Sequence, residues 1–90
     1  MVVIRKKTWP SEFKDILDGK KRFDVRLDDF EVGEGDVLVF EEFDPKKGEY
    51  TGRKIKKRVN YLLRTKEAKY WSQKDVDEKG FIVMSLGDVE

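Results

Sequence analysis

The sequence contains no cysteine and no histidine. Their absence excludes disulfide bonds, cysteine nucleophiles, histidine bases and the usual protein ligands of zinc. A metal site is left with carboxylate and carbonyl oxygens, and the acidic residues between positions 28 and 44 lack the spacing of a calcium-binding loop such as the EF-hand. We therefore expect no metal and no cofactor, and interpret this acidic stretch as a solubilising surface.

Long apolar runs are also missing. No window approaches the roughly 20 apolar residues that a membrane-spanning helix needs, and "MVVIRKKTWP" carries charge where a signal peptide would be apolar. We expect a cytoplasmic protein with no membrane partner. Asn60 and Gln73 are the only side-chain amides, and together with the abundant Lys and Glu this composition favours adaptation to high temperature.

The length and composition indicate one folded domain over residues 1–90. Hydrophobic residues make up 38% of the chain and charged residues 43%, and the apolar positions recur at short, regular spacings. A domain of this size buries roughly 60 to 65% of the surface of its unfolded chain. The core is therefore expected to be small.

A strand followed by a helix is predicted near the beginning of the sequence. "VVIRKK" is β-branched and short, as in a strand. In the segment that follows, Pro10 suits the first turn of a helix, and Phe13, Ile16 and Leu17 fall on one helical face. Gly19 suits the end of the helix, where a left-handed backbone is least costly for glycine.

Residues 22–27, "RFDVRL", alternate between charged and apolar side chains. This pattern predicts a half-buried strand with Phe23, Val25 and Leu27 in the core. Arg22, Asp24 and Arg26 would then lie on the opposite, solvent-facing side.

The remaining segments are predicted to be mostly strands. The run from Val37 to Phe40 indicates a buried strand, and the turn-forming residues 44–52 indicate a hairpin. Residues 53–63 predict a long strand whose first half is exposed and whose second half enters the core. Residues 64–79 predict a loop or short helix held by Tyr70 and Trp71, and "GFIVMSL" predicts a closing strand. Since no βαβ alternation is evident, we expect an α+β fold with a mostly antiparallel, barrel-like sheet.

Charges of opposite sign are segregated along the chain although the net charge is only +1. All charged residues of the segment 28–44 are acidic, whereas those of "GRKIKKR" at 52–58 are basic. A basic strand can contact RNA phosphates, or it can guard a sheet edge against aggregation. Both interpretations stay open for its cations, which are Arg53, Lys54, Lys56, Lys57 and Arg58.

"GKKRFDVR", residues 19–26, resembles the signature of ASCH domains, Gly-x-Lys-x-x-Glu-x-Arg. Gly19, Lys21 and Arg26 match it, and Asp24 stands where Glu is usual. "VGEGDVLVF", "FDPKKGEYTGRKI" and "GFIVMSL" are similar, in the same order, to segments of a small ASCH-related group without assigned function.

This resemblance implies a PUA-like β-barrel with one or two helices and a role in binding RNA. It also implies an alternative, because some small ASCH proteins are amidohydrolases of acylated cytidine that use a lysine at the position of Lys21 and a threonine at that of Asp24. An aspartate is a weaker nucleophile towards an amide, and its charge disfavours a neutral lysine base. The enzyme is therefore the second hypothesis.

The leading hypothesis is a cleft, framed by Lys21, Asp24 and Arg26, that binds RNA or a nucleotide. Arg26 suits a phosphate, Lys21 supplies a point charge, and Asp24 can accept a hydrogen bond from a base or a ribose. The competing interpretation is a solvated strand face with ordinary ion pairs. A protein-interaction module with a charged face is a third hypothesis, and the sequence does not indicate an oligomeric state. For Trp9, Tyr70 and Trp71, packing around the small core is favoured over base stacking.

Overall fold

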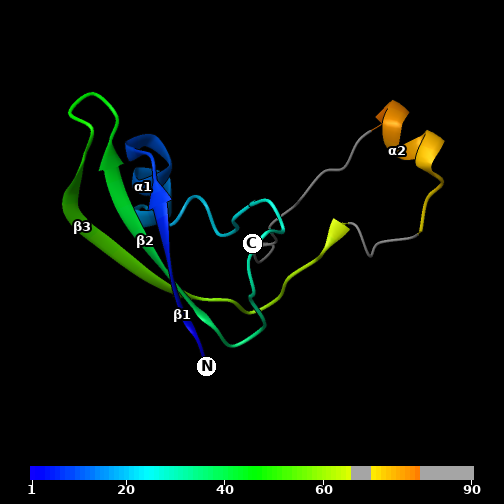
Figure 1. The fold of residues 1–90 in the computed structure, drawn as a ribbon, viewed down its shortest axis with the longest axis horizontal. Helices are drawn as coiled ribbons and strands as arrows, with labels where there is room; N and C mark the ends of the chain where they lie inside the picture. Colours follow the sequence, from blue (N-terminus) through cyan, green and yellow to red (C-terminus); the bar gives the residue numbers. More distant parts are fainter. Residues whose placement is uncertain (66–69, 80–90) are drawn as a thin grey trace, which may run out of the picture.

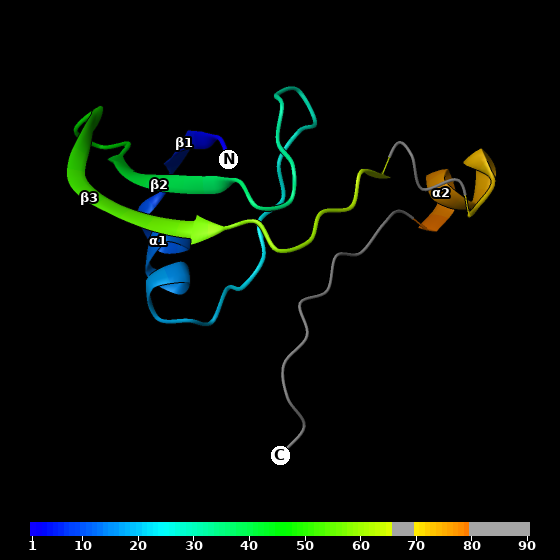
Figure 2. The same cartoon turned by 90° about the horizontal axis from the view of Figure 1, so that it is seen from below.

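The computed structural model describes residues 1–65 and 70–79. Along them lie β1 (Val3–Thr8), α1 (Pro10–Leu17), β2 (Val37–Asp44), β3 (Glu49–Arg58) and α2 (Gln73–Lys79). The strands and α1 are grouped together, and α2 lies apart from them in both Figure 1 and Figure 2. The expected α+β class is confirmed.

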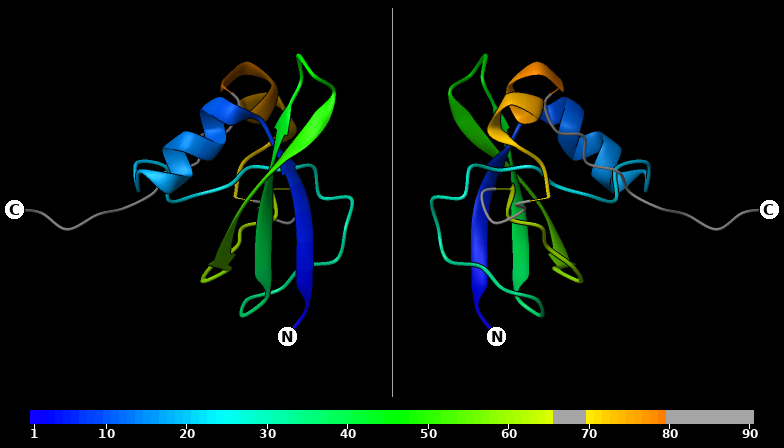
Figure 3. Two further views of the ribbon diagram at one scale, coloured as in Figure 1. Left: turned by 90° about the vertical axis from the view of Figure 1, so that its left-hand side faces the viewer. Right: turned by 90° about the vertical axis from the view of Figure 1, so that its right-hand side faces the viewer.

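β2 is the middle strand of a three-stranded sheet with the order β1-β2-β3, and Figure 3 shows the strands side by side in this order. β3 is antiparallel to β2, as the predicted hairpin requires, with Ile55 opposite Phe40. β1 runs parallel to β2, with Ile4 opposite Leu38. The sheet is therefore mixed, and the expectation of no βαβ unit was wrong, because β1, α1 and β2 form one.

The parallel pair depends on a long connection. Parallel neighbours need a crossover of about a dozen residues or more, and residues 9–36 supply it. α1 takes up only eight of these residues, and most of the others are irregular. The sequence therefore shows no long helical pattern that would have predicted a crossover between parallel strands. Within the described part of the chain the three strands form an open sheet, not the closed barrel that was expected.

α1 begins and ends where the sequence predicts. Pro10 lies in its first turn, and Gly19 follows its end with a φ of 77°. Phe13 and Ile16 are buried on its apolar side, whereas Leu17 is exposed. The guanidinium of Arg53 lies 4.9 Å from the centre of the Phe13 ring, which places α1 over the sheet face that carries Arg53.

The segment expected to be a strand at 22–27 is irregular, and its apolar side is exposed. Phe23, Val25 and Leu27 are 41%, 62% and 81% exposed. The side chains of Asp24 and Arg26 are only 14% and 28% exposed. Asp24 lies next to Lys21, and the guanidinium of Arg26 reaches Asp24 and the carbonyl oxygen of Lys7 on β1, whereas Arg22 stays exposed.

The hairpin between β2 and β3 is confirmed, with Gly48 at a φ of 69° in its turn. β3 ends at Arg58, and Tyr61 and Leu63 are exposed, so the second half of the predicted strand does not enter the core. The core residues of the sheet are instead Val39 and Phe40 of β2.

The predicted short helix in 64–79 corresponds to α2. Ser72 precedes it, and its hydroxyl oxygen accepts a hydrogen bond of 3.1 Å from the backbone N–H of Asp75. Tyr70 and Trp71 contact each other edge to face, with ring centres 5.4 Å apart, and both are exposed. The predicted closing strand, "GFIVMSL", lies outside the described residues.

Candidate nucleic-acid interface

Alternation along the strands separates two faces of the sheet. The inner face is covered by α1 and carries Phe40, Glu42, Arg53 and Ile55. The outer face is the opposite one, and strand pairing arranges its residues in rows. From one end to the other these rows are Val3–Val37–Arg58, Arg5–Val39–Lys56 and Lys7–Glu41–Lys54, and then the pair Phe43–Tyr50, which Trp9 joins by a ring contact.

The outer face is strongly basic. Its charged residues are five cations and one carboxylate, namely Arg5, Lys7, Lys54, Lys56 and Arg58 against Glu41. All five cationic residues are exposed. Val39, in the middle of this face, is nonetheless only 4% exposed. Long side chains such as those of its neighbours Arg5 and Lys56 can cover an apolar residue with their stems while their charged ends stay in water.

The predicted basic residues of β3 are thus divided between the two faces. Lys54 lies 3.7 Å from the carboxylate of Glu41. Arg58 donates a 2.7 Å hydrogen bond to the carbonyl oxygen of Gly35. Lys56 has no ion pair or hydrogen bond within residues 1–65 and 70–79. Arg53 points to the inner face, away from these three.

Arg53 is held by Glu42, a carboxylate that is only 5% exposed. The guanidinium donates two hydrogen bonds of 2.9 Å to Glu42, and the hydroxyl of Thr51 donates a third of 2.8 Å. The bonds from Arg53 hold the pKa of Glu42 below its usual range, and this effect outweighs the opposing effect of burial. Arg53 is therefore part of the folded framework, and its charge is already neutralised.

Gly52 makes this arrangement possible. The register of β2 and β3 shifts between Glu41 and Phe43, and Gly52 lies in the bulge with a φ of 94°. In the register of Glu41 and Lys54, Gly52 would stand opposite Phe43; after the shift, Tyr50 stands there. The bulge thereby brings both Thr51 and Arg53 to Glu42 and places an aromatic ring beside Phe43.

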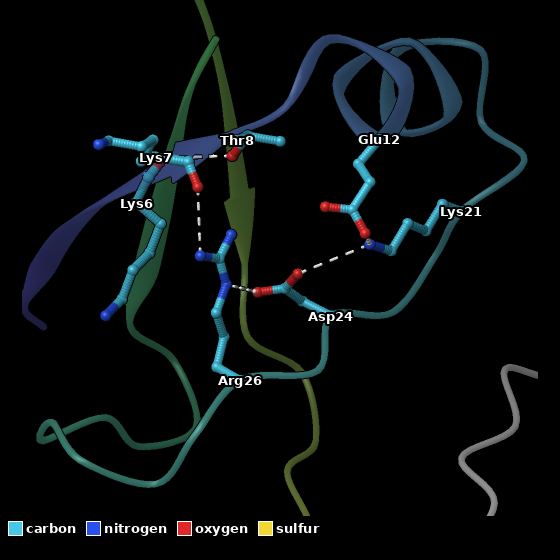
Figure 4. A network of polar contacts seen from close by, with 7 residues as sticks. All are labelled: Lys6, Lys7, Thr8, Glu12, Lys21, Asp24 and Arg26. Atoms are coloured by element: carbon cyan, nitrogen blue, oxygen red, sulfur yellow. Dashed lines mark hydrogen bonds and ion pairs between the residues drawn. The ribbon is translucent and has the colours of Figure 1, made fainter. Parts of the chain in front are cut away.

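The structure brings Lys21, Asp24 and Arg26 together in one chain of contacts (Figure 4). The ammonium of Lys21 lies 3.2 Å from Glu12 and 3.9 Å from Asp24. Arg26 donates through Nε to Asp24 at 2.8 Å and through Nη1 to the carbonyl oxygen of Lys7 at 3.2 Å. These contacts, which we call the crossover cluster, tie residues 21–26 to α1 and to β1.

The crossover cluster is electrically balanced, because the cations Lys21 and Arg26 face the carboxylates Glu12 and Asp24. A shallow hollow of about 280 Å³ lies next to it, lined by Asp15, Lys20, Lys21 and Phe23. Asp24 and Arg26 do not line this hollow. The nucleotide cleft expected around the three residues stays a prediction, and the same contacts also suit an internal ionic latch.

Figure 4 also shows that the side chain of Lys7 points away from Arg26, whereas that of Lys6 extends along the side of the strand where the crossover cluster lies. Lys6 places its ammonium 3.3 Å from the centre of the Phe30 ring, in the crossover segment. Lys7 places its own 4.2 Å from the centre of the Phe43 ring, on the outer face. Adjacent lysines of β1 thus serve opposite faces.

The described residues contain no group of three or more acidic side chains that could hold a metal ion. Among the helices of residues 1–65 and 70–79, none has the length and apolarity needed to cross a bilayer.

A family model described as "Domain of unknown function (DUF3850)" matches residues 5–86. The chain belongs to the DUF3850 family. No curated protein and no solved structure matches it. The description of the DUF3850 family names no activity and no ASCH domain, so the ASCH resemblance of this DUF3850 domain stays a prediction.

The sequence analysis missed Arg5 and Lys7 of this DUF3850 domain as site residues. Exposed and less exposed positions alternate from Val3 to Thr8, but the residue types do not, because Arg5, Lys6 and Lys7 follow one another. Their significance depends on β1 lying next to β2, which brings Arg5 and Lys7 to the same face as Lys54 and Lys56. The pairing of β1 with β2 cannot be predicted from the local sequence of either strand.

Proposed function

We propose that this domain binds RNA, with the outer face of its sheet contacting the phosphate backbone. The observation that carries the proposal is the concentration of five cations against one carboxylate on a single face, in a chain whose net charge is only +1. Such a one-sided field attracts a polyanion even when the whole chain is nearly neutral. The role in RNA binding implied by the ASCH resemblance agrees with this proposal.

Three of the five cations are free of ion pairs and carbonyl contacts in the part of the chain that the structure describes: Arg5, Lys7 and Lys56. Arg5 and Lys56 therefore give up no ion pair or carbonyl contact when they meet a phosphate, and the ammonium of Lys7, which lies over the Phe43 ring, has no anionic partner to lose. Arg5 and Lys56 flank Val39 in one row, and Lys7 stands in the next row. If these three each meet one phosphate of a single strand, log affinity should fall with log salt with a slope of about −2.

The proposal also includes a nucleotide site at the crossover cluster and a PUA-like barrel. Closure of such a barrel requires strands beyond the three of the described residues. The alternative of an amidohydrolase has no support from the geometry, because Lys21 is held between the carboxylates of Glu12 and Asp24.

The test compares two neighbouring lysines of β3. Lys56 is opposite Val39 on the outer face, and Lys57 is opposite Leu38 on the inner face. Binding of a fluorescent single-stranded RNA of about 12 nucleotides is measured by fluorescence anisotropy. The salt concentration is varied from about 20 to about 200 mM, a range over which binding through phosphate contacts weakens strongly. Lys56→Glu should weaken binding more than Lys57→Glu, although both variants change the net charge equally.

Equal losses for the two variants would show that only the net charge matters and that no face is used. Absence of binding by the unaltered protein at about 20 mM salt, where phosphate contacts are strongest, would refute the proposal. The double variant Arg5→Ala/Lys56→Ala should reduce the steepness of the salt dependence by about 1.4, which corresponds to two lost phosphate contacts.

A further inference from the structure

Three aromatic side chains lie together at one end of the outer face. The ring centres of Trp9 and Phe43 are 5.7 Å apart, and those of Phe43 and Tyr50 are 5.2 Å apart. Trp9 is 47% exposed and Tyr50 is 53% exposed. We call these three residues the aromatic row. It occupies the position after Lys7, Glu41 and Lys54, so that the basic rows lead directly to it.

The aromatic row is not part of the core. The buried apolar residues of the described chain are Phe13 and Ile16 of α1, Phe40 of the inner face and, on the outer face, Val39, and none of them belongs to the aromatic row. Trp9 and Tyr50 keep about half of their surface in water, where it contributes little to folding. Their rings meet Phe43 at 56° and 76°, so neither lies flat against it. Tilted rings leave aromatic faces open to a further planar group.

We infer that the aromatic row is a stacking platform for unpaired bases, and hence that the nucleic acid bound by this domain is single-stranded. The inference rests on the proposed RNA binding and adds to it the class of RNA and the residues that meet the bases. Proteins that bind single strands combine a basic track for the backbone with aromatic side chains on which bases stack. Both features occur here on one face, in adjacent rows.

Lys7 joins the two features. Its ammonium lies 4.2 Å from the centre of the Phe43 ring, which places a positive charge at the boundary between the basic rows and the aromatic row. A phosphate at Lys7 would therefore hold the attached nucleotide next to Phe43. Bases in a duplex are stacked on one another and cannot reach rings in this position without unpairing. Single strands meet no such cost.

Charge decides between this occupant and a protein partner. A second copy of the chain would bring its own basic rows against the first, which is unfavourable, whereas a polynucleotide has the complementary charge along its whole length. The platform also makes no demand on sequence, because every base has a flat aromatic face. We therefore expect modest base preference.

The experiment reports directly on Trp9. The chain has two tryptophans, and Trp71→Phe leaves Trp9 as the only one. In this background, single-stranded oligouridine should quench the tryptophan fluorescence, whereas a duplex RNA of the same length and an abasic ribose-phosphate chain should not. Tyr50→Leu, which removes a ring but keeps an apolar side chain, should weaken single-strand binding about tenfold and leave the salt slope unchanged. Tyr50→Phe should restore affinity.

Each outcome separates the platform from the proposed RNA binding. If the salt slope is present but oligouridine leaves Trp9 fluorescence unchanged and Tyr50→Leu binds normally, the platform is refuted and phosphate binding stands. If duplex and single strand bind equally, the inferred class of RNA is wrong. If no nucleic acid binds and sedimentation shows a dimer that Tyr50→Leu disperses, the outer face is a self-association surface and both proposals fail. Thermal unfolding of each variant verifies that it is folded.

Discussion

Lys7 of β1 and Phe43 of β2 meet on the outer face, with the lysine ammonium 4.2 Å from the centre of the phenylalanine ring. This contact joins strands that are neighbours through a parallel crossover and links the basic rows to the aromatic row. Glu41, which is opposite Lys7 on β2, pairs with Lys54 of β3. One line of side chains across all three strands therefore defines the face that we propose as the RNA-binding surface.

Alanine substitutions of Phe13 and Phe23 test which side chains of the N-terminal half are buried. Phe13→Ala should cost about 3 to 5 kcal/mol of unfolding free energy, because Phe13 is 1% exposed. Phe23→Ala should cost less than about 1 kcal/mol, because its ring is 41% exposed. Urea unfolding followed by circular dichroism measures both. A large loss for Phe23→Ala would mean that residues 22–27 pack as the alternation first suggested.

The bulge in β3 requires glycine at position 52. Gly52→Ala should destabilise the domain by about 1 to 2 kcal/mol, because a φ of 94° is unfavourable for any residue with a Cβ atom. No atom lies within 4 Å of the added Cβ, so the cost is one of backbone conformation. Gly33→Ala is the matched control, since Gly33 lacks a positive φ and its nearest neighbour would be 4.0 Å away. Similar melting temperatures for the two variants would argue against the bulge.

Glu42 makes the stability of the domain depend on pH. Its pKa is lowered, chiefly by hydrogen bonds from Arg53, so the folded state holds this carboxylate ionised more strongly than the unfolded chain does. The resulting stabilisation is present above the ordinary glutamate pKa and is lost as the pH falls through the lowered value. Thermal unfolding between about pH 7 and pH 2, a range that spans carboxylate titration, measures this dependence.

Glu42→Gln should flatten that acid branch and lower stability at neutral pH, because Arg53 loses its charged partner. Glu34→Gln serves as the control, since Glu34 is exposed and has no ion pair or hydrogen bond in the described part of the chain. An acid branch that is the same in both variants would assign the pH dependence to other carboxylates, of which Asp36 also has a lowered pKa through bonds from the backbone of Val2 and Gly33.

The crossover cluster can be tested as a latch and as a nucleotide site in one variant. Asp24→Asn removes the charge that Lys21 and Arg26 share, and should cost about 1 to 2 kcal/mol of unfolding free energy. Asp29→Asn, at an exposed neighbouring position, should cost almost nothing.

Binding then separates the two roles of the crossover cluster. Binding is measured below the melting temperature of the variant, so that the protein is folded. If the crossover cluster is only a latch, Asp24→Asn leaves both the nucleotide preference and the salt slope of RNA binding unchanged. If it also forms the predicted cleft, the preferred nucleotide changes while the salt slope does not, because phosphate contacts on the outer face position a strand and do not read its bases. Competition with the four nucleoside monophosphates measures the preference.

Local signals in the sequence were sufficient for several elements. Pro10 and Gly19 mark the ends of α1 because each residue restricts or permits a particular backbone conformation, whatever surrounds it. The hairpin after β2 was predictable for the same reason, from the turn formers at 44–48. The basic character of β3 was also evident, but not its division, which gives Lys56 to the outer face and Arg53 to a buried carboxylate.

Tertiary structure decided which side of each alternating segment faces the protein. Period-two alternation from residue 22 to 27 separates two kinds of side chain, but burial depends on what lies opposite, and here Asp24 meets Lys21 and Arg26 reaches the carbonyl of Lys7. The parallel pairing of β1 with β2 is likewise a contact across 34 residues of sequence, as between Val3 and Val37. Local periodicity determines which side chains lie together on one segment, and long-range contacts determine what that segment meets.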